Sequence, residues 1–317
     1  MSSQSSLSPA GAGIYQDAST QRTAGLTLRN LSAMLLLAVM WGLSIPVTKL
    51  GLQTLPPLTL TAFRFAVAVP LLLAFAVRRH ALPWRAVPRV AALGVLGIGV
   101  GQVAQTFGVA GTSASVGTII SATIPVFIVF FAAVRLRQHV SALQRVGLLA
   151  AFAGIALVAL GHGHGAPATA TTTLAGAGWL LLSAIAIAFY YVWSVELTSA
   201  YGTGTVAAWS TLFGFIALLP WSISEFRHVP IHVTTEGVAA AVYLGVVVTV
   251  AGLFLWLNLL RVVPARVAAS VQYLQPLVGL VAASAMFGDT LGASFVGGAL
   301  LVLAGLVLTM STRQTSR

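Results

Sequence analysis

Arg64 is the side chain best suited to ligand chemistry in this sequence, because it stands inside a long apolar run. An ionisable group in such surroundings is costly to hold and is therefore a functional candidate by default. Its guanidinium offers five N–H donors in a planar fork, which suits a carboxylate or a phosphate. We predict that Arg64 binds an anionic or zwitterionic ligand, or else that it bonds to backbone carbonyl groups and holds helices together.

Polar and aromatic side chains in other apolar runs are the remaining candidates for ligand contacts. Buried amides need hydrogen-bond partners, and a cavity for amphipathic small molecules would supply them. Tyr and Trp have an alternative place in the aromatic belt at a membrane interface. The predicted binding residues are Arg64, Gln102, Gln105, Tyr190, Trp193, Gln272 and Gln275, and Tyr191, Trp209, Trp256, Asn258 and Tyr273 hold similar positions.

Signatures of enzyme and metal chemistry are missing from the sequence, which contains no GxxxxGK[ST], HExxH or GxSxG motif and no cysteine. His162 and His164 form the nearest approach to a metal pair, but two histidines without further ligands do not make a zinc site. We expect no catalytic residue, no metal and no cofactor. An integral membrane enzyme that acts on lipids is the alternative from another class, and it would need clustered His, Asp or Glu at one interface.

Composition indicates the solvent around these candidates. Of the 317 residues, 58% are hydrophobic and 7% are charged, and the mean hydropathy is +0.97. Soluble domains carry about 25% charged residues, so this chain cannot cover a surface that faces water. The net charge of +11 does not indicate a nucleic-acid partner, because the basic residues lie in short clusters between apolar runs.

About ten apolar runs approach the roughly 20 residues that a helix needs to cross a bilayer. They are continuous rather than alternating, which argues against a β-barrel. We interpret residues 1–30, which precede them, as a disordered cytoplasmic tail. The predicted spans are 31–50, 57–77, 88–109, 114–134, 142–160, 174–195, 204–223, 237–258, 265–286 and 291–310.

Basic residues predict the orientation of these spans. With the N-terminus in the cytoplasm, thirteen of the sixteen Lys and Arg residues fall on the cytoplasmic side. Lys49 and Arg227 fall on the other side, where Lys49 is expected to extend toward the interface. The positive-inside rule favours this arrangement, so we expect both termini in the cytoplasm.

The sequence repeats its proline and glycine positions at an offset of 151 residues. Pro125 coincides with Pro276, and Gly147 and Gly154 coincide with Gly298 and Gly305. Each half holds five spans, an odd number, so the two copies must cross the membrane in opposite directions. Such inverted repeats are typical of transporters. The predicted fold is an all-α integral membrane protein of ten transmembrane helices, arranged as two five-helix inverted-topology repeats over 31–160 and 174–310.

The repeat resembles the EamA family of the drug/metabolite transporter superfamily. The first half has Trp41-Gly42, Pro57 and Arg64, and both halves show a proline, an acidic position and two spaced glycines. The acidic positions are Gln138 and Asp289 here, where the family usually has Glu. The resemblance covers roughly residues 31–310 and implies ten helices that export metabolites or drugs.

We therefore expect a permease that exports small organic metabolites, such as amino acids or drugs, across a bacterial inner membrane by alternating access. Its partners would be a small-molecule substrate and the lipid bilayer, without nucleic acid, and the protein would be a monomer or a homodimer. An exchanger of phosphorylated or nucleotide-linked sugars is the alternative within transport.

Acidic residues and histidines bear on energy coupling, because proton-driven transporters use such groups inside the membrane. Each His is expected in a loop, and the five acids fall in the tail or near span ends. Glu196 is the acid that a small shift of span boundaries would bury. The sequence therefore favours exchange or uniport over proton coupling.

Overall fold

The computed structural model describes residues 27–76, 82–135, 141–160, 172–231, 233–263, 271–289 and 291–310. These residues form helices with short connections, without a strand among them. Eight helices are long and apolar enough to cross a membrane, and two shorter apolar helices follow. The all-α prediction is confirmed, and the protein is a multi-pass membrane protein.

The long helices begin and end within a few residues of the predicted spans, and several consist of consecutive segments. Four are continuous: α3 (Pro57–Ala76), α8 (Ala142–Leu160), α9 (Leu174–Trp193) and α11 (Thr203–His228). Two consist of two segments each: Leu28–Gly51, of α1 (Leu28–Gly42) and α2 (Ser44–Gly51), and Ala114–Arg135, of α6 (Ala114–Ser121) and α7 (Ile124–Arg135). Two contain a π-helical segment: Trp84–Ala110, with α4 (Val87–Leu93), η3 (Gly94–Gly99) and α5 (Val100–Ala110), and Thr235–Val262, with α12 (Thr235–Val242), η5 (Tyr243–Ala251) and α13 (Gly252–Val262).

Two shorter helices occupy the last two predicted spans, α15 (Val271–Phe287) and α16 (Ala293–Met310). The predicted start of the ninth span at 265 lies outside the described residues. A short helix that the sequence did not predict, α10 (Val195–Tyr201), follows α9 after a break at Ser194. A similar break at Leu43 separates α1 from α2.

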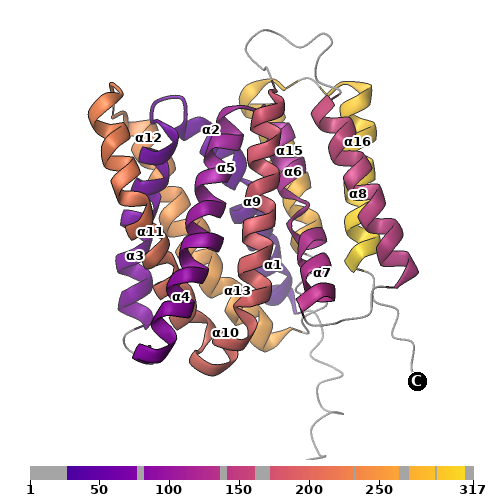
Figure 1. Cartoon of the computed structure of the whole chain (residues 1–317). Coiled ribbons are helices and arrows are strands. Elements are labelled where there is room, and N and C mark those ends of the chain that lie inside the picture. Colours follow the sequence, from indigo (N-terminus) through magenta and orange to yellow (C-terminus); the bar gives the residue numbers. More distant parts are fainter. Residues whose placement is uncertain are drawn as a thin grey trace, which may run out of the picture.

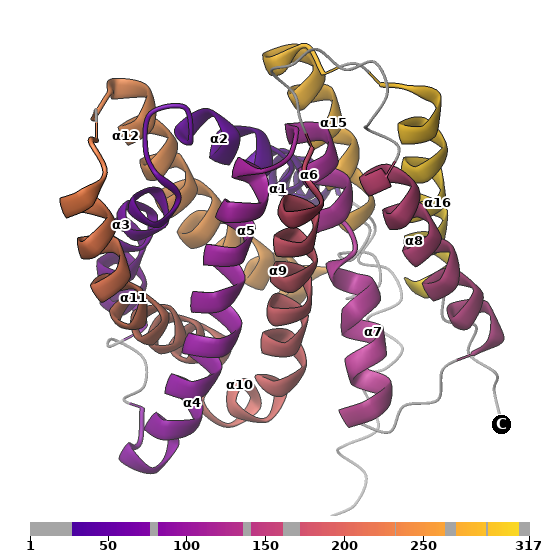
Figure 2. The ribbon, with the colours of Figure 1, turned by 45° about the horizontal axis from the view of Figure 1, so that its top comes forward.

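The helices form one bundle (Figure 1). At one side lie α3, α11 and α12, and at the other lie α8 and α16, an arrangement that the second view repeats (Figure 2). Contacts join α3 to α11, α8 to α16, α1 to α15 and α7 to α9. Between the two sides lie α1, α2, α5, α6, α9 and α15, which position the site described below.

Small residues bring α8 and α16 into close contact, because glycines let two helix backbones approach each other. A Cβ atom at Gly305 would lie 2.6 Å from the Gly147 carbonyl oxygen, and one at Gly154 would lie 2.6 Å from the Gly298 carbonyl oxygen. The two backbones therefore meet without side chains between them at both levels.

Two carboxylates hold the starts of helices that lie far from them in sequence. Glu225 of α11 accepts hydrogen bonds from the Thr59 backbone N–H (2.7 Å) and hydroxyl (2.9 Å) at the start of α3. Asp289 accepts from the Ser115 backbone N–H (2.9 Å) and hydroxyl (2.7 Å) at the start of α6. A negative charge is favourable at a helix N-terminus, so both acids stabilise the packing of helices.

Candidate functional site

A cavity of about 350 Å³ lies among the central helices. Its walls come from both halves of the chain, with α1–α3 and α5–α7 on one part and α9, η5, α13 and α15 on the other. Its apolar and aromatic lining includes Trp41, Ile45, Ile128, Ile187, Tyr191 and Trp256. Its polar lining residues are Ser44, Arg64, Gln102, Gln105, Thr118, Ser121, Gln272 and Gln275.

Five of the seven predicted binding residues line this one cavity. Arg64 extends from α3, Gln102 and Gln105 from α5, and Gln272 and Gln275 from α15. The structure thus brings together polar groups that are more than 200 positions apart in the sequence. Tyr191 and Trp256, which hold similar sequence positions, also line it.

Tyr190 and Trp193 lie away from the cavity. Tyr190 is buried against Leu93 and Val206, and the ring of Trp193 stacks on Phe189 with their centroids 4.5 Å apart. The cavity face of α9 carries Ile187 and Tyr191, which are four positions apart and share one side of the helix. The sequence identified the correct helix for these aromatics but did not reveal which face it turns inward.

Arg64 is held in place by two neutral partners. Its Nε donates to the Thr249 hydroxyl oxygen (3.0 Å), and its Nη1 donates to the Gln102 amide oxygen (2.6 Å). The side chain is buried, yet it contributes to the cavity wall. These bonds fix the guanidinium and leave its other terminal nitrogen, Nη2, without a bond to any described residue.

The π-helical segment η5 positions two cavity groups at once. The Val248 carbonyl oxygen accepts from the Trp41 indole N–H (3.1 Å), and the next residue, Thr249, accepts from Arg64. The Thr249 hydroxyl in turn donates to the Leu244 carbonyl oxygen (2.8 Å). π-Helical turns often occur at functional sites because they redirect side chains, and η5 redirects these two acceptors toward α1 and α3.

Trp41, Ser44, Thr118 and Ser121 were not predicted as binding residues. Trp41 lies beside the break at Leu43, and its ring centroid is 5.9 Å from that of Trp256. Ser121 ends α6, directly before the interruption that separates it from α7. The Trp-Gly pair and the small hydroxyl residues were visible in the sequence, but the helix breaks beside them were not.

Gln275 carries an unpaired donor within the cavity wall. Its amide nitrogen, Nε2, is buried and has no hydrogen-bond partner in the described part of the chain. Buried amides are nearly always paired. The nitrogen itself is enclosed, so a ligand in the cavity would reach it only after a rotation of the side chain.

Lys49 extends to the end of a neighbouring membrane span. Its ammonium donates to three backbone carbonyl oxygens, those of Val109 (3.0 Å), Ala110 (3.3 Å) and Thr112 (2.6 Å). Carbonyl groups at the end of a helix lack intrahelical partners, so Lys49 closes the end of α5 rather than touching the cavity.

Glu196 also lies outside the cavity lining. Its carboxylate pairs with Arg135 (2.9 Å), and 67% of its side chain is exposed. His228, expected in a loop, lies in the last turn of α11 and is exposed. His162, His164 and Gln138 lie outside the described residues, and the described residues contain no cluster of three metal-ligating side chains.

Comparison with known families identifies the chain. The model of the EamA-like transporter family matches residues 29–160 and 174–311. The chain belongs to the EamA-like transporter family. This confirms the resemblance, and the cavity is thus the central cavity of an EamA-like transporter.

Several curated relatives of this EamA-like transporter are similar over most of their length. An uncharacterised transporter of Archaeoglobus fulgidus is 26% identical and is covered over 95% of its length and 86% of this chain. A probable terminal-alkyne amino-acid exporter of Streptantibioticus cattleyicolor is 29% identical, with 91% and 87% covered. A probable amino-acid metabolite efflux pump of Salmonella typhimurium is 28% identical, with 96% and 89% covered.

One protein of known crystal structure has a similar fold. It superposes with a TM-score of 0.61 at 17% sequence identity, over 88% of this chain and 96% of its own. At this identity the likeness concerns the fold alone.

Proposed function

We propose that this EamA-like transporter exports small organic metabolites that carry a carboxylate, by alternating access across a bacterial inner membrane. The observation that carries the proposal is Arg64, a buried cation held by two neutral partners in the wall of the central cavity. Its fork suits a carboxylate. Two relatives named as an amino-acid exporter and an efflux pump support the direction and the size of the substrate.

The ten-span arrangement as two inverted repeats is part of this proposal. The helix breaks at Leu43 and Ser194 are separated by the same 151 positions as the sequence repeat. The segments η3 and η5 are both π-helical, and Gly94 and Gly245 within them also differ by 151 positions. The contact of α1 with α15 has its counterpart in that of α9 with α7.

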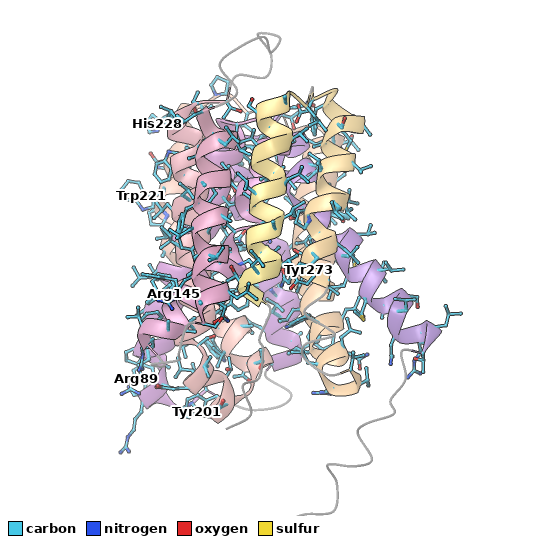
Figure 3. The ribbon with its side chains drawn as sticks, turned by 90° about the vertical axis from the view of Figure 1, so that its right-hand side faces the viewer. Arg89, Arg145, Tyr201, Trp221, His228 and Tyr273 are labelled. Atoms are coloured by element: carbon cyan, nitrogen blue, oxygen red, sulfur yellow. The ribbon has the colours of Figure 1, made fainter. Side chains whose placement is uncertain are left out.

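Cytoplasmic termini complete the proposed arrangement. Arg89 lies toward one end of the bundle with Tyr201, and His228 lies at the opposite end (Figure 3). The positive-inside rule places the arginine-bearing end in the cytoplasm. Arg145 lies in the half of the bundle nearer Arg89, in agreement with this placement.

The binding set that we propose is Arg64, Gln102, Gln105, Gln272 and Gln275, all of which line the cavity. Tyr190 and Trp193 are left out because they pack away from it. Arg64 would bind the carboxylate, Gln102 would orient Arg64, and the remaining amides would bind polar groups of the substrate. An exchanger of phosphorylated sugars is less well supported, because a phosphate dianion would meet a single cation in the described lining.

Counterflow into liposomes tests the proposal. Purified protein is reconstituted with an unlabelled metabolite panel inside, and uptake of each labelled compound is measured. We expect Arg64→Gln to lower counterflow at least about tenfold, because a hydrogen bond to a charged group contributes ~1.5–3 kcal/mol. Arg64→Lys, which keeps the charge but loses the fork, should fall between Gln and wild type.

Arg227→Gln is the matched control, because Arg227 is exposed near the end of α11. It should transport like wild type. Folding of all variants is checked by gel filtration and thermal unfolding. Wild-type rates in both folded Arg64 variants would show that Arg64 is not a substrate ligand.

A further inference from the structure

The charge of Arg64 is not balanced by either of its protein partners. A hydroxyl oxygen and an amide oxygen accept its two hydrogen bonds, and 9% of its surface is exposed. A cation held within a membrane span is costly unless an opposite charge accompanies it. Arg64 therefore contributes a cation without an acidic partner to the wall of the cavity.

The acidic residues of the chain are engaged elsewhere. Of the five, Glu196 binds Arg135 at an exposed position. Glu225 and Asp289 hold the starts of α3 and α6, and Glu236 is exposed in the first turn of α12. The fifth, Asp17, lies outside the described residues. The described lining therefore has a net charge of one positive unit, and a ligand is the available source of the negative charge.

The rest of the lining defines the body of such a ligand. Isoleucines from α2, α7 and α9 and the rings of Trp41 and Trp256 form apolar walls. Glutamine side chains from α5 and α15 add neutral polar groups. At roughly 30 Å³ for each water-sized group, the volume of about 350 Å³ holds about a dozen non-hydrogen atoms.

We propose that the cavity carries organic monoanions, each with one carboxylate and a compact apolar body, in preference to zwitterionic amino acids. This inference rests on the proposed transport function. A monoanion on Arg64 makes the occupied cavity neutral. A zwitterion leaves the occupied cavity with its positive charge, and its ammonium finds neutral amide and hydroxyl oxygens rather than a carboxylate.

Uniport of such a substrate into or out of an empty vesicle is electrogenic. Charged groups of the protein move outward and back within each transport cycle, so their net contribution is zero. The net charge moved in each cycle is therefore the single negative charge of the substrate. In a cell with a negative interior, the membrane potential drives anions outward. A potential of ~100 mV is worth ~2.3 kcal/mol per charge, which corresponds to a gradient of roughly fiftyfold. Export therefore needs neither a proton nor a titratable residue in the cavity.

Three probes of nearly equal shape and size test the inference: α-ketoisocaproate, a monoanion; leucine, a zwitterion; and leucinamide, a cation near neutral pH. Uptake of each labelled compound into proteoliposomes is measured with a potassium gradient and valinomycin, which set an inside-positive or a zero potential. Protein-free liposomes give the passive leak. The same series is run on Arg64→Gln, Arg64→Lys and the control Arg227→Gln.

We expect the monoanion to enter at least about tenfold faster than leucine, and its uptake to rise when the interior is positive. Arg64→Gln should lose the preference, whereas Arg64→Lys should keep the preference at a lower rate. Any monoanion uptake that remains in either variant should still respond to potential, because the substrate carries the charge. Arg227→Gln should behave like wild type. This pattern supports the inference.

Equal or faster uptake of leucine, independent of potential, would overturn the inference and leave the transport function standing. Uptake of α-ketoisocaproate that does not respond to potential would also overturn it. Failure of all three probes while other panel compounds show counterflow would overturn the inference alone. Failure of every compound with folded protein would overturn the proposed function as well.

Discussion

The interface between α8 and α16 gives a sharp test of how closely the helices pack. In Gly305→Ala the added methyl group would lie 2.6 Å from the Gly147 carbonyl oxygen and 2.7 Å from the Ala151 backbone nitrogen. Ordinary contact begins near 3.4 Å, so the helices must separate by about 0.8 Å. Backbone atoms cannot rotate aside as a side chain does.

Separation of these helices is expected to cost stability. Overpacking a close interface typically costs ~1–3 kcal/mol, and the obstacles here are backbone atoms, which favours the upper part of that range. Replacing Gly by Ala within a helix stabilises that helix by up to about 1 kcal/mol, which offsets part of this cost. We therefore expect Gly305→Ala to lower the free energy of unfolding by about 2 kcal/mol.

Gly297→Ala is the matched control on the same helix. Its added methyl group would meet Leu157 Cδ2 at 3.6 Å, an ordinary contact, so its stability should equal that of wild type or exceed it by up to about 1 kcal/mol. Unfolding by sodium dodecyl sulfate in mixed micelles, followed by circular dichroism, measures both variants. Equal stability of Gly305→Ala and Gly297→Ala would refute the argument from close backbone contact.

Three further predictions concern the helix end at Lys49, the topology and the energy source. Lys49→Met removes three hydrogen bonds of 2.6–3.3 Å to carbonyl oxygens near the end of α5. It should lower the free energy of unfolding by ~1–3 kcal/mol in the same assay. An unchanged free energy of unfolding would contradict a stabilising role for Lys49 at this helix end. Reporter fusions just before Trp84 and at the C-terminus should report cytoplasm, and one between α8 and α9 the exterior, whereas an external C-terminus is incompatible with ten spans in inverted repeats. An imposed pH gradient at zero membrane potential should produce no uphill accumulation in vesicles; if accumulation occurs and disappears in Glu196→Gln, the proton pathway includes Glu196.

The helices were predictable from the sequence because lipid imposes a simple rule. A span needs an unbroken apolar stretch, and the observed ends, such as Pro57 and Ala142, coincide with the predicted ones. The interruptions at Leu43 and Ser194 were not predicted, because a break of one residue leaves the hydropathy of the run unchanged. The π-helical segments were invisible for the same reason.

The cavity was partly predictable because polar side chains are rare inside apolar runs. Arg64 and the four glutamines stand out on that ground alone, and all five line the cavity. Aromatic residues carry no comparable signal, since Trp and Tyr also occur in interfacial belts and in packed cores. Tyr190 and Tyr191 are adjacent in sequence, yet one packs against Val206 and the other lines the cavity.

Lys49 shows a second limit of sequence reasoning. Its position near the end of an apolar run is equally compatible with reaching water and with binding carbonyl groups of another helix. The choice depends on α5 ending within reach of its ammonium, which is a property of the tertiary fold.

The two acceptors in η5 are consecutive residues, and this links the indole and the guanidinium mechanically. A π-helical turn contains one residue more than an α-helical turn would need. If η5 relaxed to α-helical register, Val248 and Thr249 would rotate together, and Trp41 and Arg64 would lose their acceptors in the same movement. We therefore expect removal of one residue from η5 to break both hydrogen bonds together, so that the orientation of the Trp41 ring and that of the Arg64 guanidinium depend on the same segment.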